Sequence, residues 1–90
     1  MIKHFEITVY GKVQGVGYRA AAGKKAELLG LKGFVMNNFS GSVYIEAEGD
    51  SGKLTEFLSW CHVGPSFAEV ENVMFKEKPV QNYEFFEIRR

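Results

Sequence analysis

The feature that most constrains this chain is a change of hydrophobic period near its N-terminus. From Ile2 to Val13 apolar residues alternate with polar or charged ones, a period of two that predicts a strand with one solvent-facing side. Gly15 and Gly17 interrupt this alternation. The apolar residues that follow are spaced as on one helix face, up to Gly30: Tyr18, Ala22, Ala26 and Leu29. The pattern predicts a strand, a tight loop and a helix in direct succession.

Two further strand patterns follow, joined by turn residues. The ranges Gly33–Phe39 and Ser42–Gly49 flank Ser40-Gly41, and the alternation in the second range predicts that the two pair as a hairpin. Asp50 is placed to cap a second helix that ends before Gly64-Pro65. The apolar face of this helix is predicted at Leu54, Phe57, Leu58 and Cys61.

The remaining residues predict two more strands. Val70, Val73 and Phe75 indicate a strand whose alternation slips once between Val70 and Val73, as at a β-bulge, and Tyr83–Ile88 indicates a short last strand. The order β, α, β, β, α, β with a small closing strand predicts an α+β, ferredoxin-like sandwich, in which two helices cover one face of an antiparallel sheet. We expect residues 1–90 to form a single domain. This architecture alone names no function.

Composition narrows the class of protein. Eleven Lys and Arg residues balance eleven Asp and Glu residues, so the formal net charge is zero, which argues against a nucleic-acid partner but leaves room for one local anion pocket. The single cysteine, Cys61, has no partner for a disulfide, and no apolar run near the N-terminus suits a signal peptide or a membrane span. We therefore expect a cytoplasmic protein.

The stretch from Gly11 to Arg19 carries the chemistry. Closely spaced glycines at the start of a helix allow successive backbone N–H groups to point inward as an anion-binding nest, and the guanidinium of Arg19 can hold two phosphate oxygens at once. The P-loop pattern is absent, and so is the third glycine of a Rossmann loop, because position 20 is Ala. On spacing alone, a tight turn with a solvated arginine is the simpler interpretation.

Three segments together resemble the paired signature of acylphosphatases: Val13-Gln14-Gly15-Val16-Gly17-Tyr18-Arg19, Gly33-Phe34-Val35-Met36-Asn37 and Gly41-Ser42-Val43. The resemblance extends to Glu48-Gly49-Asp50, Gly64-Pro65 and Phe86-Glu87-Ile88, and so covers nearly the whole chain. It implies the ferredoxin-like fold and hydrolysis of the carboxyl-phosphate bond of acyl phosphates. By position, Arg19 would bind the phosphate and Asn37 would orient the attacking water. The phosphate cradle would be the backbone N–H groups of Gly15, Val16, Gly17, Tyr18 and Arg19.

The departures from the family pattern are mild. Phe34 stands where the family often has Trp, Tyr18 stands where it more often has Phe, and Ala20-Ala21-Ala22 is a plainer helix start. These differences bear on the packing beside the site and on the turnover rate, and not on the class of reaction.

Such residues suffice for this reaction because an acyl phosphate is a mixed anhydride with a carboxylate leaving group. Attack of water on phosphorus spreads charge over the phosphoryl oxygens, and preorganised donors are the usual large contribution to its rate. A neutral amide at Asn37 can accept from water without bringing a negative charge to the phosphate. We expect no metal and no cofactor, an acyl phosphate as substrate, inorganic phosphate as product, no nucleic acid or membrane partner, and a monomer.

Other reactive side chains have simpler interpretations. Cys61 lies on the apolar stripe of the second helix and is expected to be a buried, inert thiol. His4 and His62 lack the spacing of a metal site. The glutamates of the strand patterns are expected on a solvated sheet face: Glu46, Glu48, Glu69, Glu71, Glu77, Glu84 and Glu87.

Two alternative functions remain at this point. One is a non-catalytic anion-binding or acyl-phosphate-binding module of the same fold, which also occurs within larger proteins. The other is an RNA-binding sheet of the same strand order, disfavoured by the zero net charge and by the lack of a basic, glycine and aromatic run on an inner strand.

Overall fold

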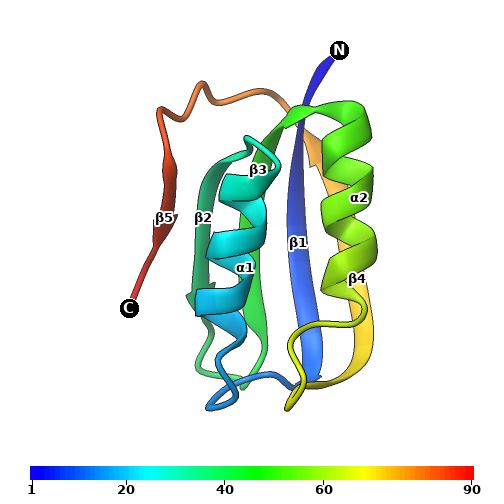
Figure 1. Cartoon of the computed structure of the whole chain (residues 1–90), viewed down its shortest axis with the longest axis vertical. Coiled ribbons are helices and arrows are strands. Elements are labelled where there is room, and N and C mark those ends of the chain that lie inside the picture. Colours follow the sequence, from blue (N-terminus) through cyan, green and yellow to red (C-terminus); the bar gives the residue numbers. More distant parts are fainter.

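Two helices cover one face of a five-stranded sheet in the computed structural model, which describes all 90 residues (Figure 1). The sheet order is β4-β1-β3-β2-β5, and the predicted ferredoxin-like α+β fold is confirmed. In chain order the elements are β1 (Ile2–Lys12), α1 (Tyr18–Leu28), β2 (Lys32–Asn37), β3 (Val43–Asp50), α2 (Ser51–Cys61), β4 (Glu69–Lys78) and β5 (Phe86–Ile88).

The edge strand β5 departs from the predicted antiparallel sheet. The pairs β1–β3, β1–β4 and β2–β3 are antiparallel, whereas β5 pairs with β2 in parallel. After β4 the chain crosses over one end of the sheet to the opposite edge, where only the outer side of β2 is free (Figure 1). Strand β5 therefore runs back toward the end of the molecule at which α1 begins. Residue alternation indicates the faces of a strand but not its neighbours, so the sequence could not show this pairing.

The helix N-cap, the hairpin and the bulge predicted from the sequence are confirmed. Asp50 caps α2, since its carboxylate accepts from the N–H groups of Gly52 at 3.1 Å and Lys53 at 3.2 Å. Strands β2 and β3 form the hairpin. The slip in β4 is a bulge, because Tyr10 pairs with Asn72 while the next residue, Gly11, pairs with Val70.

The core lies between the sheet and the two helices. Its largest fully buried side chains come from the predicted apolar stripes, with Ile7 on β1, Ile45 on β3, and Leu54 and Phe57 on α2. Cys61 is fully buried, and this burial raises the pKa of its thiol to about 12, in keeping with an inert residue. No helix has the length and apolar character needed to span a membrane.

The sheet face opposite the helices contains a buried polar cluster, so the prediction of a fully solvated face is wrong there. His4 is fully buried, with Nδ1 at 2.9 Å from Glu48 Oε1 and Nε2 at 2.8 Å from Glu46 Oε1. The backbone N–H groups of Gln81 and Tyr83 each donate to the Glu48 carboxylate at 2.8 Å. The segment between β4 and β5 thus covers Glu48 and leaves Glu46 half-buried. The other five predicted surface glutamates are exposed.

This cluster makes the stability of the fold depend on Glu48. Burial acts to raise the pKa of its carboxyl, but the N–H groups of Gln81, His4 and Tyr83 lower it to below its usual range. A lowered pKa means that the carboxylate contributes stability fully above the unfolded-state value of about 4.3, and that this contribution is lost as pH falls through the folded-state pKa.

We expect Glu48→Gln to lower the free energy of unfolding at pH 7 by about 2–4 kcal/mol, since the neutral amide leaves buried donors without an acceptor. As the pH falls below 5, the free energy of unfolding of the variant should also decrease less than that of the parent. Urea denaturation across this range measures both effects. Glu77→Gln is the control, because Glu77 is exposed and faces only Lys3 at 3.7 Å, so it should change stability by less than about 1 kcal/mol. Equal effects of the two substitutions would contradict the assignment.

Candidate active site

The loop between β1 and α1 has a backbone that only glycine adopts without strain. Gly15 has a φ of +74° and Gly17 a φ of +79°, and a Cβ atom at either position would meet nothing within 4 Å. Conformation rather than space therefore favours glycine at both positions. Gly17 is also the N-cap of α1, where it provides no side-chain cap, and the first turn of the helix has no acidic residue.

The N-terminus of α1 is consequently rich in unpaired donors. The first helical hydrogen bond runs from Ala21 N–H to Gly17 O at 3.1 Å. None of the backbone N–H groups of residues 15–20 donates to an acceptor within the protein. Successive free N–H groups at the positive end of a helix form an anion-binding site.

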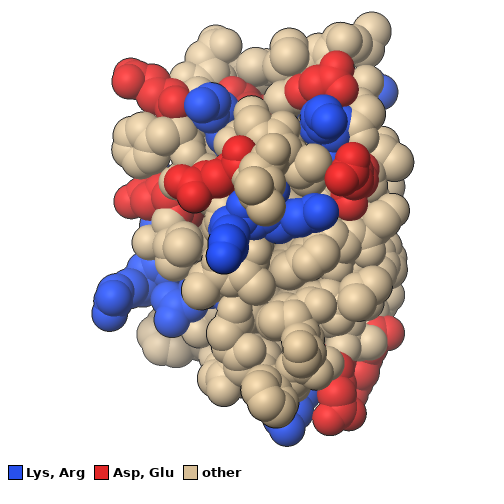
Figure 2. All heavy atoms as spheres, viewed as in Figure 1, with Lys and Arg blue, Asp and Glu red and all other residues tan.

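All of these residues except Val16 line a cavity of about 400 Å³ at the end of the sheet where the loop lies. Figure 2 shows basic side chains without acidic ones among them at the lower left, near the C-terminus marked in Figure 1. The cavity therefore combines backbone donors with cationic side chains. Its lining residues are Val13, Gln14, Gly15, Gly17, Tyr18, Arg19, Ala20, Asn37, Ile88 and Arg90.

Arg19 lies in the first turn of α1 and is half-buried, not fully exposed. Its Nη1 donates to the carbonyl oxygen of Arg89 at 2.8 Å, and it has no salt bridge to a carboxylate. This contact leaves the other N–H groups of the guanidinium free of protein partners, on a residue that lines the cavity. The arrangement suits a bidentate contact with a phosphate.

Asn37 ends β2 and lines the same cavity. Its Oδ1 atom is buried and has no hydrogen-bond partner in the protein, which is uncommon for a buried polar atom. Strands β1 and β2 are not neighbours, because β3 lies between them. The loop that follows β1 and the last residue of β2 nevertheless line the same cavity.

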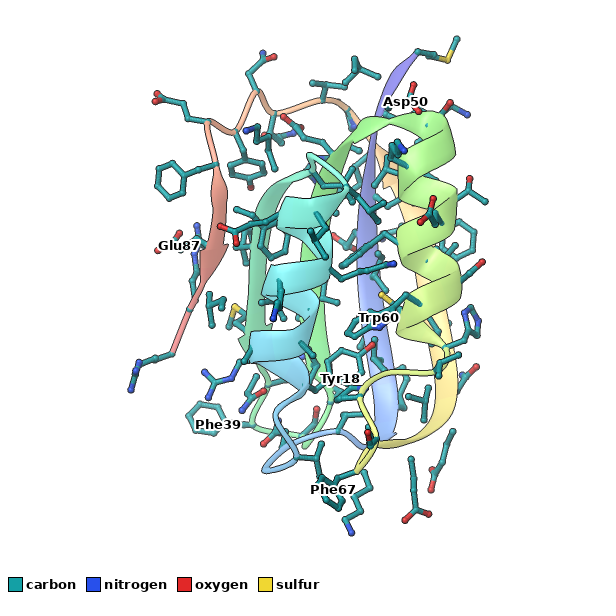
Figure 3. The ribbon with its side chains drawn as sticks, in the orientation of Figure 1. Tyr18, Phe39, Asp50, Trp60, Phe67 and Glu87 are labelled. Carbon is teal, nitrogen blue, oxygen red and sulfur yellow. The ribbon has the colours of Figure 1, made fainter.

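Two of the departures from the family pattern, Tyr18 and Phe34, have local partners away from the cavity's polar groups. The hydroxyl of Tyr18 donates to the carbonyl of Cys61 at 2.8 Å and the ring lies beside Trp60, so the start of α1 is fastened to the end of α2 (Figure 3). Burial raises the pKa of this hydroxyl above its usual range. Phe34 packs under the Arg89 guanidinium, 3.7 Å from its ring centroid.

Sequence reasoning gave no site role to five residues of the cavity lining: Val13, Gln14, Ala20, Ile88 and Arg90. Ile88 and Arg90 reach it only because β5 runs parallel to β2, which local pattern does not reveal. Gln14 was within the recognised motif but was given no role, although a long amide directly before the glycine loop was a visible signal.

Comparisons with known proteins identify the family and the fold. The family described as Acylphosphatase matches residues 5–88. An acylphosphatase of Thermotoga maritima is 46% identical over 88 residues, which are 98% of each chain. The structure of an acylphosphatase from Coxiella burnetii superposes with a TM-score of 0.95 at 39% identity, over 98% of this chain and 93% of that one. Full-length HypF, in a phosphate- and nucleotide-bound form, contains a similar fold in 12% of its chain, which covers all of this one at 34% identity and a TM-score of 0.93.

We expect inorganic phosphate to bind the folded protein at this cavity and to raise its thermal midpoint. Mass action predicts a stabilisation of about 1.4 kcal/mol at roughly tenfold excess over the dissociation constant. The effect should largely disappear in Arg19→Ala and persist in Asn37→Ala. Thermal denaturation measures it, with chloride at matched ionic strength as the control. A midpoint indifferent to millimolar phosphate would leave the glycines as turn formers alone.

Proposed function

Because the chain belongs to the acylphosphatase family, we propose that Arg19, Asn37 and the backbone N–H groups of residues 15–19 are the site of its reaction. The protein is an enzyme that hydrolyses the carboxyl-phosphate bond of acyl phosphates to a carboxylate and inorganic phosphate. A non-catalytic binding module of the same fold is not favoured, since the relatives that match nearly the whole chain are named as the enzyme.

The phosphoryl group is held by the loop and Arg19. The free N–H groups at the start of α1 create a positive electrostatic potential in the cavity, and the guanidinium of Arg19 adds a planar pair of donors. These donors are in place before the substrate arrives, so little reorganisation accompanies the build-up of charge on the phosphoryl oxygens. The Arg89 carbonyl restrains Arg19 through Nη1 and supports this preorganisation.

Asn37 orients the water. The observation that carries this role is its buried Oδ1 atom, an acceptor without a protein partner at the wall of the cavity. A water that donates to this oxygen is held with its lone pairs free to attack phosphorus on the side opposite the leaving carboxylate. Because the amide is neutral, it stabilises the water without repelling the phosphate.

No side chain of the cavity can act as a general base at neutral pH, since its arginines stay protonated, and none is needed. The lining contains no histidine, cysteine or carboxylate. The proton of the attacking water can pass to a phosphoryl oxygen of the substrate, while the carboxylate leaves as a weak base. Cys61 is buried in the core with its thiol pKa raised to about 12, and it takes no part.

We also propose the oligomeric state, the cellular compartment and the class of substrate. Every group in the proposed site comes from one chain, so we propose that residues 1–90 act as a single domain and as a monomer. The free thiol of Cys61 supports a reducing, cytoplasmic compartment. The formal net charge of zero supports a small-molecule substrate over nucleic acid.

We expect Arg19→Ala to lower kcat/KM by about 10³-fold or more, because a cation on the transferred group is worth that much in phosphoryl transfer. Arg19→Lys should recover little, since an ammonium cannot donate in the same bidentate geometry. The measurement is steady-state hydrolysis of a generic acyl phosphate, with unfolding curves to show that both variants remain folded. A nearly normal rate in the alanine variant would remove Arg19 from the site.

Asn37→Ala should behave differently. We expect kcat to fall about 10²-fold or more while the inhibition constant of inorganic phosphate changes by less than about threefold, because Asn37 acts on the water and not on the phosphate. A loss of phosphate affinity with kcat unchanged would reverse this assignment.

Activity should be insensitive to reagents that act elsewhere. The proposed reaction draws its donors from Arg19 and the loop, so a chelator such as EDTA and the substitution Cys61→Ser should each leave kcat within about twofold of the parent once the protein is folded. Hydrolysis assays with and without the chelator test this expectation. Strong inhibition that one added metal reverses would contradict it.

A further inference from the structure

Gln14 is the one residue whose side chain joins the glycine loop to the turn of the β2–β3 hairpin. Its Nε2 atom donates to the carbonyl of Asn38 at 2.8 Å and to the carbonyl of Ser42 at 2.9 Å. The two protons of a primary amide are thereby both used. No other hydrogen bond connects residues 13–17 with residues 37–43.

The backbone does not make this connection elsewhere. The ladder between β1 and β3 ends at the pair Val9 and Val43, and β1 then continues beside β4 alone up to Lys12. Asn37 itself has no side-chain hydrogen bond that could fix its position. The sheet places its backbone, since Asn37 pairs with Val43 and Val43 with Val9, but the loop that follows Lys12 is hydrogen-bonded to residues 37–43 through Gln14 alone.

We propose that Gln14 is a positioning residue, whose side-chain amide sets the distance between the phosphate cradle and Asn37 by holding the hairpin turn against the loop. The inference rests on the proposed function, in which the cradle binds the phosphate and Asn37 orients the water. Gln14 need not touch the reacting atoms in this role. It acts through the segment that carries Asn37.

The hairpin turn is held together independently of Gln14. The Asn38 carbonyl also accepts from Gly41 N–H at 3.1 Å, and the Ser42 carbonyl also accepts from Asn38 N–H at 2.9 Å. Loss of the amide would therefore let the turn shift as a unit without unfolding it. The loop N–H groups and Arg19 make no bond to Gln14, so phosphate binding should survive.

The first test is Gln14→Met, which keeps the length of the side chain and removes both donors. We expect kcat to fall by about 10- to 100-fold, the scale of a misplacement of about 1 Å, with the inhibition constant of inorganic phosphate within about threefold of the parent. The matched control is Gln81→Met. The Nε2 atom of Gln81 also donates to a backbone carbonyl, that of Pro79 at 2.9 Å, outside the cavity, so kcat should not change.

A double substitution separates positioning from general loosening. If Gln14 acts through Asn37, Gln14→Met should lower kcat by less than about threefold in the Asn37→Ala background, since coupled effects are not additive. A full additional loss there, or an unchanged kcat in Gln14→Met alone, would overturn the proposal. If Asn37→Ala itself retains its kcat, the proposed function fails, whereas a loss in Asn37→Ala beside an unaffected Gln14→Met overturns only the positioning role.

A donor-retaining variant keeps the test open if Gln14→Met does not fold. The ammonium of Gln14→Lys can donate to both turn carbonyls, so it should retain a kcat at least about threefold above that of the folded Ala variant, Gln14→Ala. Equal rates in these two variants would contradict the positioning role, because both differ from the parent in size but only one lacks donors.

Discussion

The proposed site depends on backbone N–H groups at the start of α1, where those of residues 15–20 have no acceptor within the protein. The two helices of the molecule begin in opposite ways. At α2 the carboxylate of Asp50 accepts hydrogen bonds from backbone N–H groups of the first turn. At α1 the N-cap is Gly17, which has no side chain that could accept them. A capping carboxylate at position 17 would satisfy the donors and repel an anion. The phosphate-binding role proposed for the start of α1 thus requires that α1 lack the capping side chain that stabilises α2.

Much of the fold was accessible from residue patterns because the elements are local. The alternation in β1 and β3, the Asp50 cap and the slip in β4 each depend on neighbours within a few positions. The burial of His4 and Glu48 was not accessible, because it depends on a segment more than thirty residues further along the chain that supplies Gln81 and Tyr83 as donors. The same crossing places β5 parallel to β2, which pattern alone did not predict.

The residues of the site likewise divide into those that the sequence could identify and those that it could not. The residues themselves pointed to Arg19 as a possible phosphate ligand, although spacing alone favoured a solvated turn at residues 15–19, and only the family resemblance identified Asn37. Both residues line one cavity in the structure, although β3 separates β2, which ends at Asn37, from β1, which leads into the loop before Arg19. Ile88 and Arg90 reach that cavity from the end of the chain, and the carbonyl of Arg89 restrains Arg19. Contacts between residues so far apart in the chain are set by tertiary packing, which local sequence patterns do not reveal.

The bulge in β4 also affects how separate molecules of this protein meet. Strand β4 forms one edge of the sheet, and an edge strand offers unpaired backbone groups to any passing chain. The extra residue at the bulge breaks the regular spacing of those groups and increases the local twist. Half of the ten residues of β4 are charged, including Lys76, Glu77 and Lys78 in succession. An incoming strand would meet an irregular register and a run of charged side chains, so these features of the long edge oppose intermolecular sheet growth and aggregation.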